Sequence, residues 1–164
     1  MPTSTALKMA PALDLPGAEG SRYALREALG RGPVLLGFFK VSCPTCQYAF
    51  PFIERIHQQL GRSGAQVWGV SQDSAADTRR FATEFGVSFP LLIDEKPYDA
   101  SRRYGVHFTP TLFLVTPDGQ VALASDGFVK SDLLEIQKWL GKHYSVAPPA
   151  LFLPQERVPE FKPG

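Results

Sequence analysis

A pair of cysteines at the end of an apolar run constrains this chain more than any other feature. Cys43 and Cys46 are its only cysteines, and they lie in the stretch 38–51, which reads FFKVSCPTCQYAFP. The apolar run 34–39 is typical of a buried strand and the residues after Cys46 of a helix, so both cysteines fall at a strand-to-helix turn. The first amides of a helix lack partners and stabilise a thiolate there. We therefore expect a reactive Cys43, with Cys46 one turn further along and able to close a disulfide with it.

Length and charge narrow the possible function classes. With 164 residues the chain is long enough for one domain with a full core and hardly long enough for two. Its 17 basic and 16 acidic residues nearly cancel, so nothing predicts binding to nucleic acid or to an anionic membrane. A disulfide between two closely spaced cysteines closes a short loop and therefore stabilises the fold little. The pair is better explained by redox chemistry or metal binding than by a structural disulfide.

No segment predicts a membrane span or a secretory leader. No run approaches the roughly 18 consecutive apolar residues that cross a bilayer. Residues 1–11 are interrupted by polar side chains and lack the long apolar core of a signal peptide. We therefore expect a cytoplasmic protein, with a trimmed extracytoplasmic protein as the alternative.

Hydrophobic periodicity predicts alternating strands and helices. Strands or extended pieces are expected at 13–15, 21–24, 34–39, 65–70, 111–115 and 121–124, and a strand or loop at 91–93. Short helices are expected at 23–29 and 98–104, and a longer one is expected from Cys46 to Leu60 with a bend near Phe50. A further helix should begin at a cap at Ser74 or Asp77 and end at Gly86, and the last helix should follow a cap at Ser131. The turn residues 117–119, Pro-Asp-Gly, predict a hairpin between the last two strands.

The composition changes near the end of the chain. Five prolines after residue 145 break every period, which excludes a long helix or a central strand. This part of the chain nevertheless contains large apolar residues, at 151–153 and 161. We expect one domain at 1–145, followed by a proline-rich tail at 146–164 that is extended and lies partly against the domain. A disordered tail is the alternative.

The order of these elements resembles the thioredoxin superfamily, and most closely its TlpA/ResA-like and AhpC/TSA-like (redoxin) branch. The two cysteines stand where that family carries its redox pair, and Pro51 stands five residues after the second one, like the helix proline of thioredoxin. The dipeptide Thr109-Pro110 is similar to the cis-proline dipeptide of the family. Residues 104–119 are similar to the YGV...PTxFLxxxDG stretch of that branch. The resemblance covers residues 11–143.

The resemblance implies an α/β, thioredoxin-like fold with a central mixed β-sheet flanked by helices and an N-terminal strand extension. In that family the cis-proline loop lies beside the cysteines, offers backbone hydrogen bonds to an extended substrate peptide and keeps metals off the sulfurs. The implied site residues are the catalytic Cys43 and Cys46, the substrate-binding Phe108, Thr109 and Pro110, and the supporting Pro44, Thr45, Pro51 and Asp73.

Three positions depart from the family pattern or leave a role open. Ser42 stands where these enzymes usually carry a tryptophan, and Gly37 stands where thioredoxin has a buried aspartate that moves protons from the second cysteine. Asp73 has two interpretations. It could take the acid/base part of the ResA-type acidic residue, or it could be an exposed loop aspartate that caps a helix.

Thiol-disulfide exchange is the mechanism that these residues favour. Cys43 attacks a disulfide as thiolate, a mixed disulfide forms, and Cys46 resolves it. The helix terminus lowers the pKa of Cys43 into the range of roughly 3.5 to 7.5 found in such motifs. No cofactor and no metal are required. The expected partners are disulfide-bearing proteins or small-molecule thiols and an unidentified thiol electron donor, and the direction of exchange stays open.

Two other functions remain as alternatives. Residues 42–45 are similar to the VCPT of peroxiredoxins, which predicts a thiol peroxidase, but Lys40 and Leu36 stand where those enzymes need a hydroxyl residue and a proline. The second alternative is a Cu(I)-binding module that uses both cysteines and His107, since soft thiolates select Cu(I).

Overall fold

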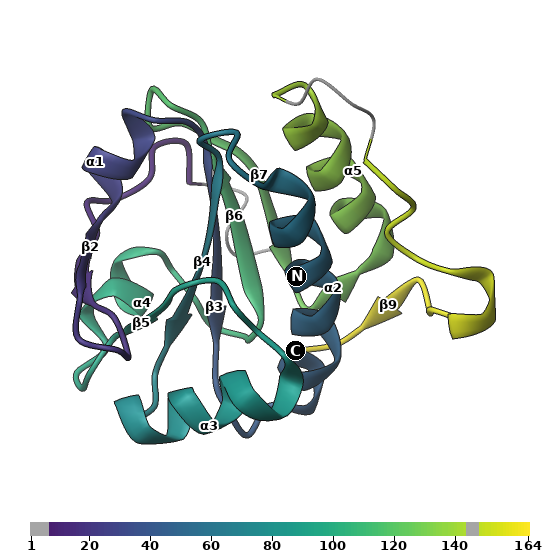
Figure 1. Ribbon diagram of the computed structural model, residues 1–164. Helices are drawn as coiled ribbons and strands as arrows, with labels where there is room; N and C mark the ends of the chain where they lie inside the picture. Colours follow the sequence, from purple (N-terminus) through teal and green to yellow (C-terminus); the bar gives the residue numbers. More distant parts are fainter. Residues whose placement is uncertain (1–6, 144–147) are drawn as a thin grey trace.

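The computed structural model describes residues 7–143 and 148–164 and is centred on a five-stranded sheet (Figure 1). The strand order is β5-β4-β3-β6-β7. The strands are β3 (Val34–Phe39), β4 (Gln66–Ser71), β5 (Leu91–Ile93), β6 (Thr111–Val115) and β7 (Val121–Asp126). Because β3 runs parallel to β4 and antiparallel to β6, the sheet is mixed. The predicted α/β class with a central mixed sheet is confirmed.

The middle strand β3 is covered on both faces, and all six of its residues are buried. Alternate residues of a strand point to opposite faces. Leu35 and Phe39 accordingly belong to one apolar cluster, and Leu36 and Phe38 belong to the other. This is why the run 34–39 is apolar without a break, and why its end is a rigid base for the cysteines that follow.

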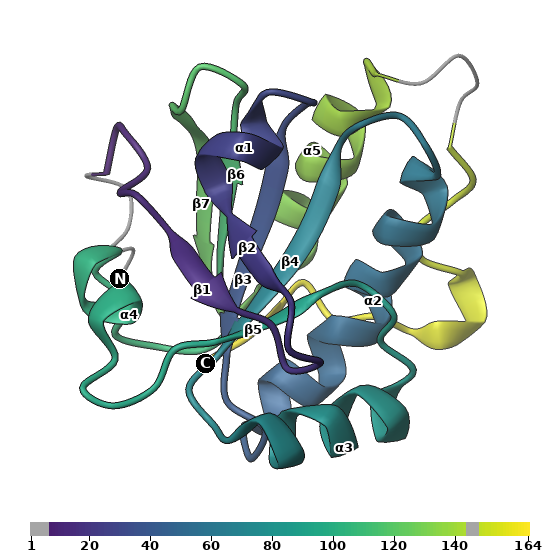
Figure 2. The same cartoon turned by 60° about the vertical axis from the view of Figure 1, so that its left-hand side comes forward.

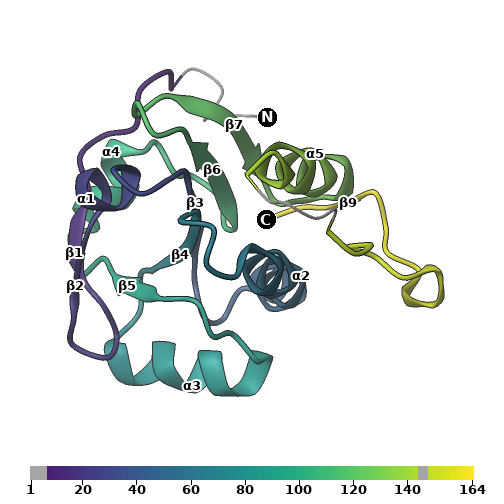
Figure 3. The ribbon, with the colours of Figure 1, turned by 45° about the horizontal axis from the view of Figure 1, so that its top comes forward.

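One face of the sheet is covered by helices α2 (Pro44–Leu60) and α5 (Lys130–Gly141), which lie side by side (Figures 1 and 3). Helix α3 (Ala75–Phe85) joins the same apolar cluster through Phe81. The inward stripe expected for α2 is buried and consists of Phe50, Ile53, Ile56 and Leu60. Pro51 lies inside α2, as expected, and the bend near Phe50 stays a prediction.

The other face carries the N-terminal hairpin of β1 (Asp14–Pro16) and β2 (Arg22–Ala24), together with α1 (Leu25–Leu29) and α4 (Asp99–Arg103) (Figure 2). The expected N-terminal strand extension is thus present. The expected helix at 23–29 begins two residues too early, because the strand pairing with β1 takes Tyr23 and Ala24. Tyr23 instead places its ring edge against Trp68 of β4, with ring centroids 5.5 Å apart.

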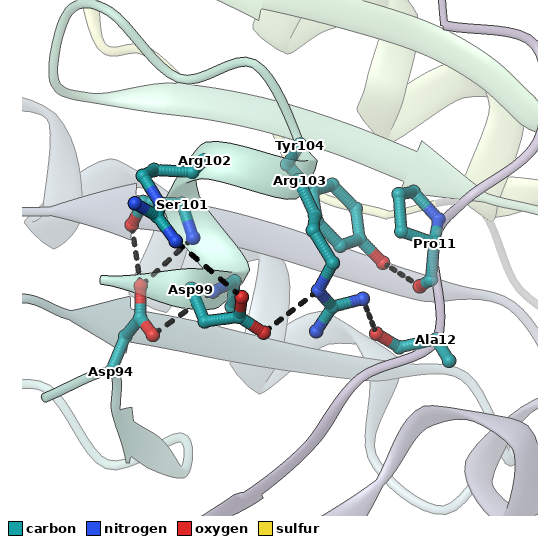
Figure 4. A network of polar contacts seen from close by, with 9 residues as sticks. Pro11, Ala12, Asp94, Asp99, Ser101, Arg102, Arg103 and Tyr104 are labelled. Atoms are coloured by element: carbon teal, nitrogen blue, oxygen red, sulfur yellow. Dashed lines mark hydrogen bonds and ion pairs between the residues drawn. The ribbon is translucent and has the colours of Figure 1, made fainter. Parts of the chain in front are cut away.

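Helix α4 is tied to the sheet and to the N-terminal segment by polar contacts (Figure 4). The buried carboxylate of Asp94 accepts hydrogen bonds from the amides of Ala100 and Ser101, at 3.1 and 2.8 Å, and so caps the helix start. The hydroxyl of Tyr104 donates to the carbonyl of Pro11 at 2.7 Å. Each of these polar groups has a hydrogen-bond partner within the protein. We therefore interpret the network as one that stabilises the fold, and not as a binding site.

The predicted hairpin is confirmed, because β6 and β7 pair antiparallel around the turn at 117–119. The predicted cap at Ser131 is wrong. Helix α5 begins at Lys130, one residue before Ser131, and Val129 at its N-cap position makes no side-chain cap. The physical reason lies far along the chain, since the amide of Lys130 donates to the carbonyl of Glu160 at 2.9 Å. A backbone partner therefore replaces the expected side-chain cap.

The described part of the tail, residues 148–164, returns along α2 (Figure 1). It contains the 3-10 helix η2 (Pro154–Glu156) and the strand β9 (Phe161–Lys162), which pairs with β8 (Phe128–Val129). Leu151 is buried, and the ring of Phe152 packs on that of Phe52 with centroids 5.0 Å apart. The expected domain boundary at 145/146 lies outside the described residues. Across 7–143 and 148–164, no helix has both the length and the apolar character to cross a bilayer.

Candidate active site

The first cysteine of the pair occupies the N-cap position of α2. Cys43 has an extended backbone, and its sulfur accepts a hydrogen bond from the amide of Cys46 at 3.2 Å. Pro44 fills the first helical position, where the missing N–H removes no helix bond. The sulfur therefore takes the place of a capping oxygen and faces the positive end of the helix.

The loop before β6 supplies the other side of the site. Thr111 pairs with Phe38 in the sheet, which places residues 108–110 next to the segment that follows β3. The sulfur of Cys43 lies 3.2 Å from the carbonyl oxygen of Thr109, and the Thr109–Pro110 peptide bond is cis. Pro110 is buried, whereas Phe108 is 48% exposed. The structure thus brings the expected residues 108–110 and the two cysteines together.

The two thiols differ sharply in their surroundings. The hydrogen bond from the Cys46 thiol lowers the pKa of Cys43 to about 5, against the opposing effect of burial, and the backbone amides of Cys46 and Thr45 help. Cys46 is fully buried, and this burial, followed by the interaction with Cys43, raises its pKa far above the ordinary value. At neutral pH the half-buried Cys43 is therefore a thiolate and Cys46 a thiol.

The expected helix cap at Asp73 is wrong, because Ser74 caps α3 by accepting from the amide of Asp77 at 3.1 Å. The Asp73 carboxylate is half-buried and accepts from the amide of Val41 at 2.8 Å. It therefore holds the backbone two residues before Cys43. The structure shows a positioning contact, and the acid/base role stays a prediction.

Three contacts around the cysteines have no counterpart in the sequence analysis. The hydroxyl of Thr45 donates to the carbonyl of Pro163 at 2.5 Å, and the side chain of Gln47 donates to the carbonyl of Val41 at 2.9 Å. The ammonium group of Lys162 lies 4.9 Å from the ring centroid of Tyr48. No local pattern signals the contacts of the tail, since Thr45 and Pro163 are 118 residues apart.

The geometry bears on both alternative functions. Among the residues that the structure describes, no group of three or more His, Cys, Asp or Glu side chains could hold a metal ion, and His107 is exposed. The trio suggested for copper is therefore not assembled. Leu36, at the position where a peroxidase needs a proline, is fully buried in β3 on the face away from Cys46.

Comparison with known proteins agrees with this arrangement. Residues 6–124, well over half of the chain, match the AhpC/TSA family. The chain belongs to the AhpC/TSA family. This AhpC/TSA chain is 30% identical over 118 residues to the thiol-disulfide oxidoreductase ResA of Halalkalibacterium halodurans, a match that covers 71% of the chain and 66% of that protein. The match therefore spans slightly less than two thirds of the length of this relative.

Two solved structures resemble the AhpC/TSA chain. A protein assigned as thiol:disulfide interchange protein DsbE, from Chlorobium tepidum, is 31% identical with a TM-score of 0.71, covering 81% of this chain and 96% of that one. The thioredoxin domain of a thiol-disulfide oxidoreductase from Bacteroides vulgatus is 22% identical with a TM-score of 0.72, covering 85% and 99%. The thioredoxin-like fold is thereby confirmed.

Proposed function

We propose that the protein is a thiol-disulfide oxidoreductase in which Cys43 attacks and Cys46 resolves. The observation that carries the proposal is the placement of Cys43 at the N-cap of α2, where its pKa is lowered to about 5 beside a buried Cys46 with a raised pKa. One cysteine is ready to attack at neutral pH and the other is kept protonated until needed. The likeness to proteins named ResA and DsbE supports this reading.

The reaction runs in two exchanges. The Cys43 thiolate attacks one sulfur of a substrate disulfide, a bond forms between the two sulfurs, and the other substrate sulfur leaves as a thiolate that takes up a proton. Cys46 then loses its proton and attacks the Cys43 sulfur, which releases the second substrate sulfur as a thiol. The substrate gains two electrons and two protons, and the protein becomes the Cys43–Cys46 disulfide. A separate thiol donor reverses this oxidation.

The surrounding residues position the two sulfurs and the substrate. We assign Phe108, Thr109 and Pro110 to substrate binding, since Thr109 contacts the Cys43 sulfur and Phe108 is exposed beside it. The supporting residues are Pro44 and Thr45 at the start of α2, Pro51 within it, and Asp73, which holds the amide of Val41.

The proposed substrates follow from the same chemistry. Disulfide-bearing proteins and small-molecule disulfides or thiols both fit a half-buried nucleophilic sulfur, and the electron donor is another thiol. The exchange uses only the sulfur atoms of the protein, its substrate and its thiol donor, so the proposed reaction needs no cofactor. We keep the prediction of a cytoplasmic location.

Trapping of the intermediate tests the proposed function. In the Cys46→Ser variant a mixed disulfide between Cys43 and glutathione should accumulate, since nothing resolves it. The Cys43→Ser variant is the matched control and should form none, because the remaining thiol is buried and protonated. Mass spectrometry distinguishes these forms. Equal labelling of both variants would overturn the assignment of roles, and the absence of labelling in Cys46→Ser would overturn the exchange mechanism.

A further inference from the structure

The segment 161–164, here called the tail strand, lies on the candidate active site. Its first two residues form β9 and pair antiparallel with β8, with Lys162 opposite Phe128 and Phe161 opposite Val129. Figure 1 shows this segment beside the first turns of α2, and Figure 3 shows it reaching between α2 and α5. The strands β8 and β9 form a two-stranded sheet of their own, and such backbone pairing is a mode by which proteins bind extended peptides.

Beyond β9 the tail strand contacts the residues that surround Cys43. Pro163 accepts the hydrogen bond from the Thr45 hydroxyl, and Thr45 lies between the two cysteines in sequence. Gly164 packs so tightly against Thr109 that an added Cβ would lie 2.5 Å from the Thr109 carbonyl oxygen. That carbonyl is the one that the Cys43 sulfur contacts at 3.2 Å. The tail strand thus uses groups on both sides of the nucleophile.

The surface beneath the tail strand approaches the backbone of that strand closely, and it also contacts one of its side chains, because the Lys162 ammonium group lies over the ring of Tyr48. Gly127 has a φ of +75°, and an added Cβ there would lie 2.7 Å from the carbonyl oxygen of Lys162. With β8, Thr45 and Thr109, it forms a platform of backbone groups and one hydroxyl. Such a platform recognises an extended segment mainly through its backbone, with a small residue beside Thr109.

The tail strand is exposed to solvent along most of its length and is anchored upstream. Phe161 is 57% exposed, and residues 163 and 164 are exposed as well. Upstream, the Arg55 guanidinium makes two hydrogen bonds to the Glu156 carboxylate, at 2.8 and 2.5 Å, and one to the carbonyl of Leu151 at 2.9 Å. An anchored segment whose end is exposed to solvent keeps a high effective concentration at its site and can still be displaced by a competing peptide.

We propose that the tail strand occupies the peptide-binding surface of the redox site, and that protein substrates enter as extended segments that pair with β8 in its place. The inference rests on the proposed function. It defines the favoured substrate class as disulfides in flexible or unfolded segments with a small residue near Thr109. It also makes the tail strand an internal competitor that slows exchange with proteins more than exchange with small disulfides.

A chain shortened to end at Glu160 tests the proposal, since it retains the anchor at Arg55 and Glu156 and the partner of the Lys130 amide. Insulin and 5,5′-dithiobis(2-nitrobenzoic acid) serve as protein and small disulfides. Shortening should raise kcat/KM for insulin reduction about tenfold, which corresponds to the tail strand covering its site about nine-tenths of the time. The small disulfide should change less than twofold. A peptide of residues 157–164 should reverse the gain competitively.

Two further variants of the full chain separate docking from folding. Gly164→Leu places a side chain against the Thr109 carbonyl and should raise insulin reduction as shortening does, with an unchanged melting temperature. Glu135→Ala, on the exposed side of α5, is the matched control and should change nothing. Equal insulin rates for the full chain, the shortened chain and Gly164→Leu would overturn the proposal.

A readout that needs no exchange distinguishes failure of this inference from failure of the proposed function. In the reduced protein, alkylation of Cys43 by a bulky polyethylene glycol maleimide should speed up several-fold on shortening, whereas alkylation by iodoacetamide should change little. If the bulky reagent reacts equally fast with both chains, the tail strand does not cover the site. If it reacts faster with the shortened chain but neither chain exchanges any disulfide, the docking stands and the proposed function fails.

Discussion

The amide nitrogen of Cys46 lies 3.2 Å from the sulfur of Cys43, so the resolving cysteine also helps to ionise the attacking one. The contact arises because residue 46 is the third residue of α2 and its amide has no partner within the helix. Both roles of the pair therefore follow from the start of one helix. Thr109, 66 residues away from Cys43, completes the site from the far side.

The ionisation of Cys43 gives the first prediction. Its pKa of about 5 predicts that the rate of alkylation by iodoacetamide rises between pH 4 and 6 and stays nearly level from 6 to 8. Absorbance of the thiolate at 240 nm should show the same midpoint. Cys43→Ser should remove the transition, because burial keeps Cys46 protonated. A midpoint near 8.5, the ordinary value for a thiol, would contradict the proposed electrostatics.

Stability of the reduced protein should depend on pH for the same reason. The folded pKa of Cys43 lies below that of the unfolded chain, so its ionisation stabilises the folded state fully above about pH 8.5, and this contribution is lost as the pH falls through 5. Relative to Cys43→Ser, the free energy of unfolding should therefore rise by about 1–2 kcal/mol from pH 5 to 8, allowing for solvent screening of a half-buried thiolate. Urea titrations at both values measure it. A constant difference would contradict the prediction.

Variants of Asp73 separate its positioning contact from an acid/base role. Asp73→Ala leaves the amide of Val41 without its acceptor and should lower the free energy of unfolding by about 1 kcal/mol and slow exchange a few-fold. Asp73→Asn retains an acceptor oxygen and should keep most of the free energy of unfolding and most of the exchange rate. The pH profile of the resolving step is the readout that decides. If Asp73→Asn loses as much activity as Asp73→Ala and shifts that profile, the residue moves protons.

The ion pair between Arg55 and Glu156 should control how firmly the tail is docked. Arg55 lowers the pKa of Glu156 to about 2. The stabilisation of the folded state by this ion pair is therefore complete above the ordinary glutamate pKa of about 4.3, and it is lost as the pH falls through 2. Glu156→Gln should make the amide of Lys130, which donates to Glu160, exchange its hydrogen several-fold faster at pH 7. Hydrogen-exchange mass spectrometry measures this. Asp77→Asn breaks an exposed ion pair on α3 and is the control. Equal exchange in all three proteins would refute the anchoring role.

Local patterns sufficed for most of the sheet and for the redox turn. The unbroken apolar run of β3, the proline after Cys43 and the Pro-Asp-Gly turn each act within a few residues, and each is found where the sequence predicts it. Ser74 caps α3 for the same reason. The site residues 108–110 came from the family resemblance instead, and the pairing of Phe38 with Thr111 explains why they meet the cysteines.

Two of the errors arise from backbone pairing that the local side-chain pattern does not encode. Tyr23 and Ala24 fit a helical pattern but pair with β1, and Ser131 fits a cap but the amide of Lys130 is satisfied by Glu160. The docking of the tail depends on Arg55, whose partner Glu156 lies 101 residues further on. Composition predicts that a proline-rich segment is extended, but it carries no information about the surface on which that segment lies.

The most direct test of the exchange mechanism is the redox equilibrium of the two cysteines. The protein is equilibrated in glutathione buffers of graded potential, and free thiols are counted by mass spectrometry after alkylation. The mechanism predicts one two-electron transition between two thiols and a Cys43–Cys46 disulfide, with a midpoint between roughly −270 and −120 mV, the range of thioredoxin-like proteins. If no intramolecular disulfide forms at any potential in this range, Cys43 and Cys46 are not a redox pair.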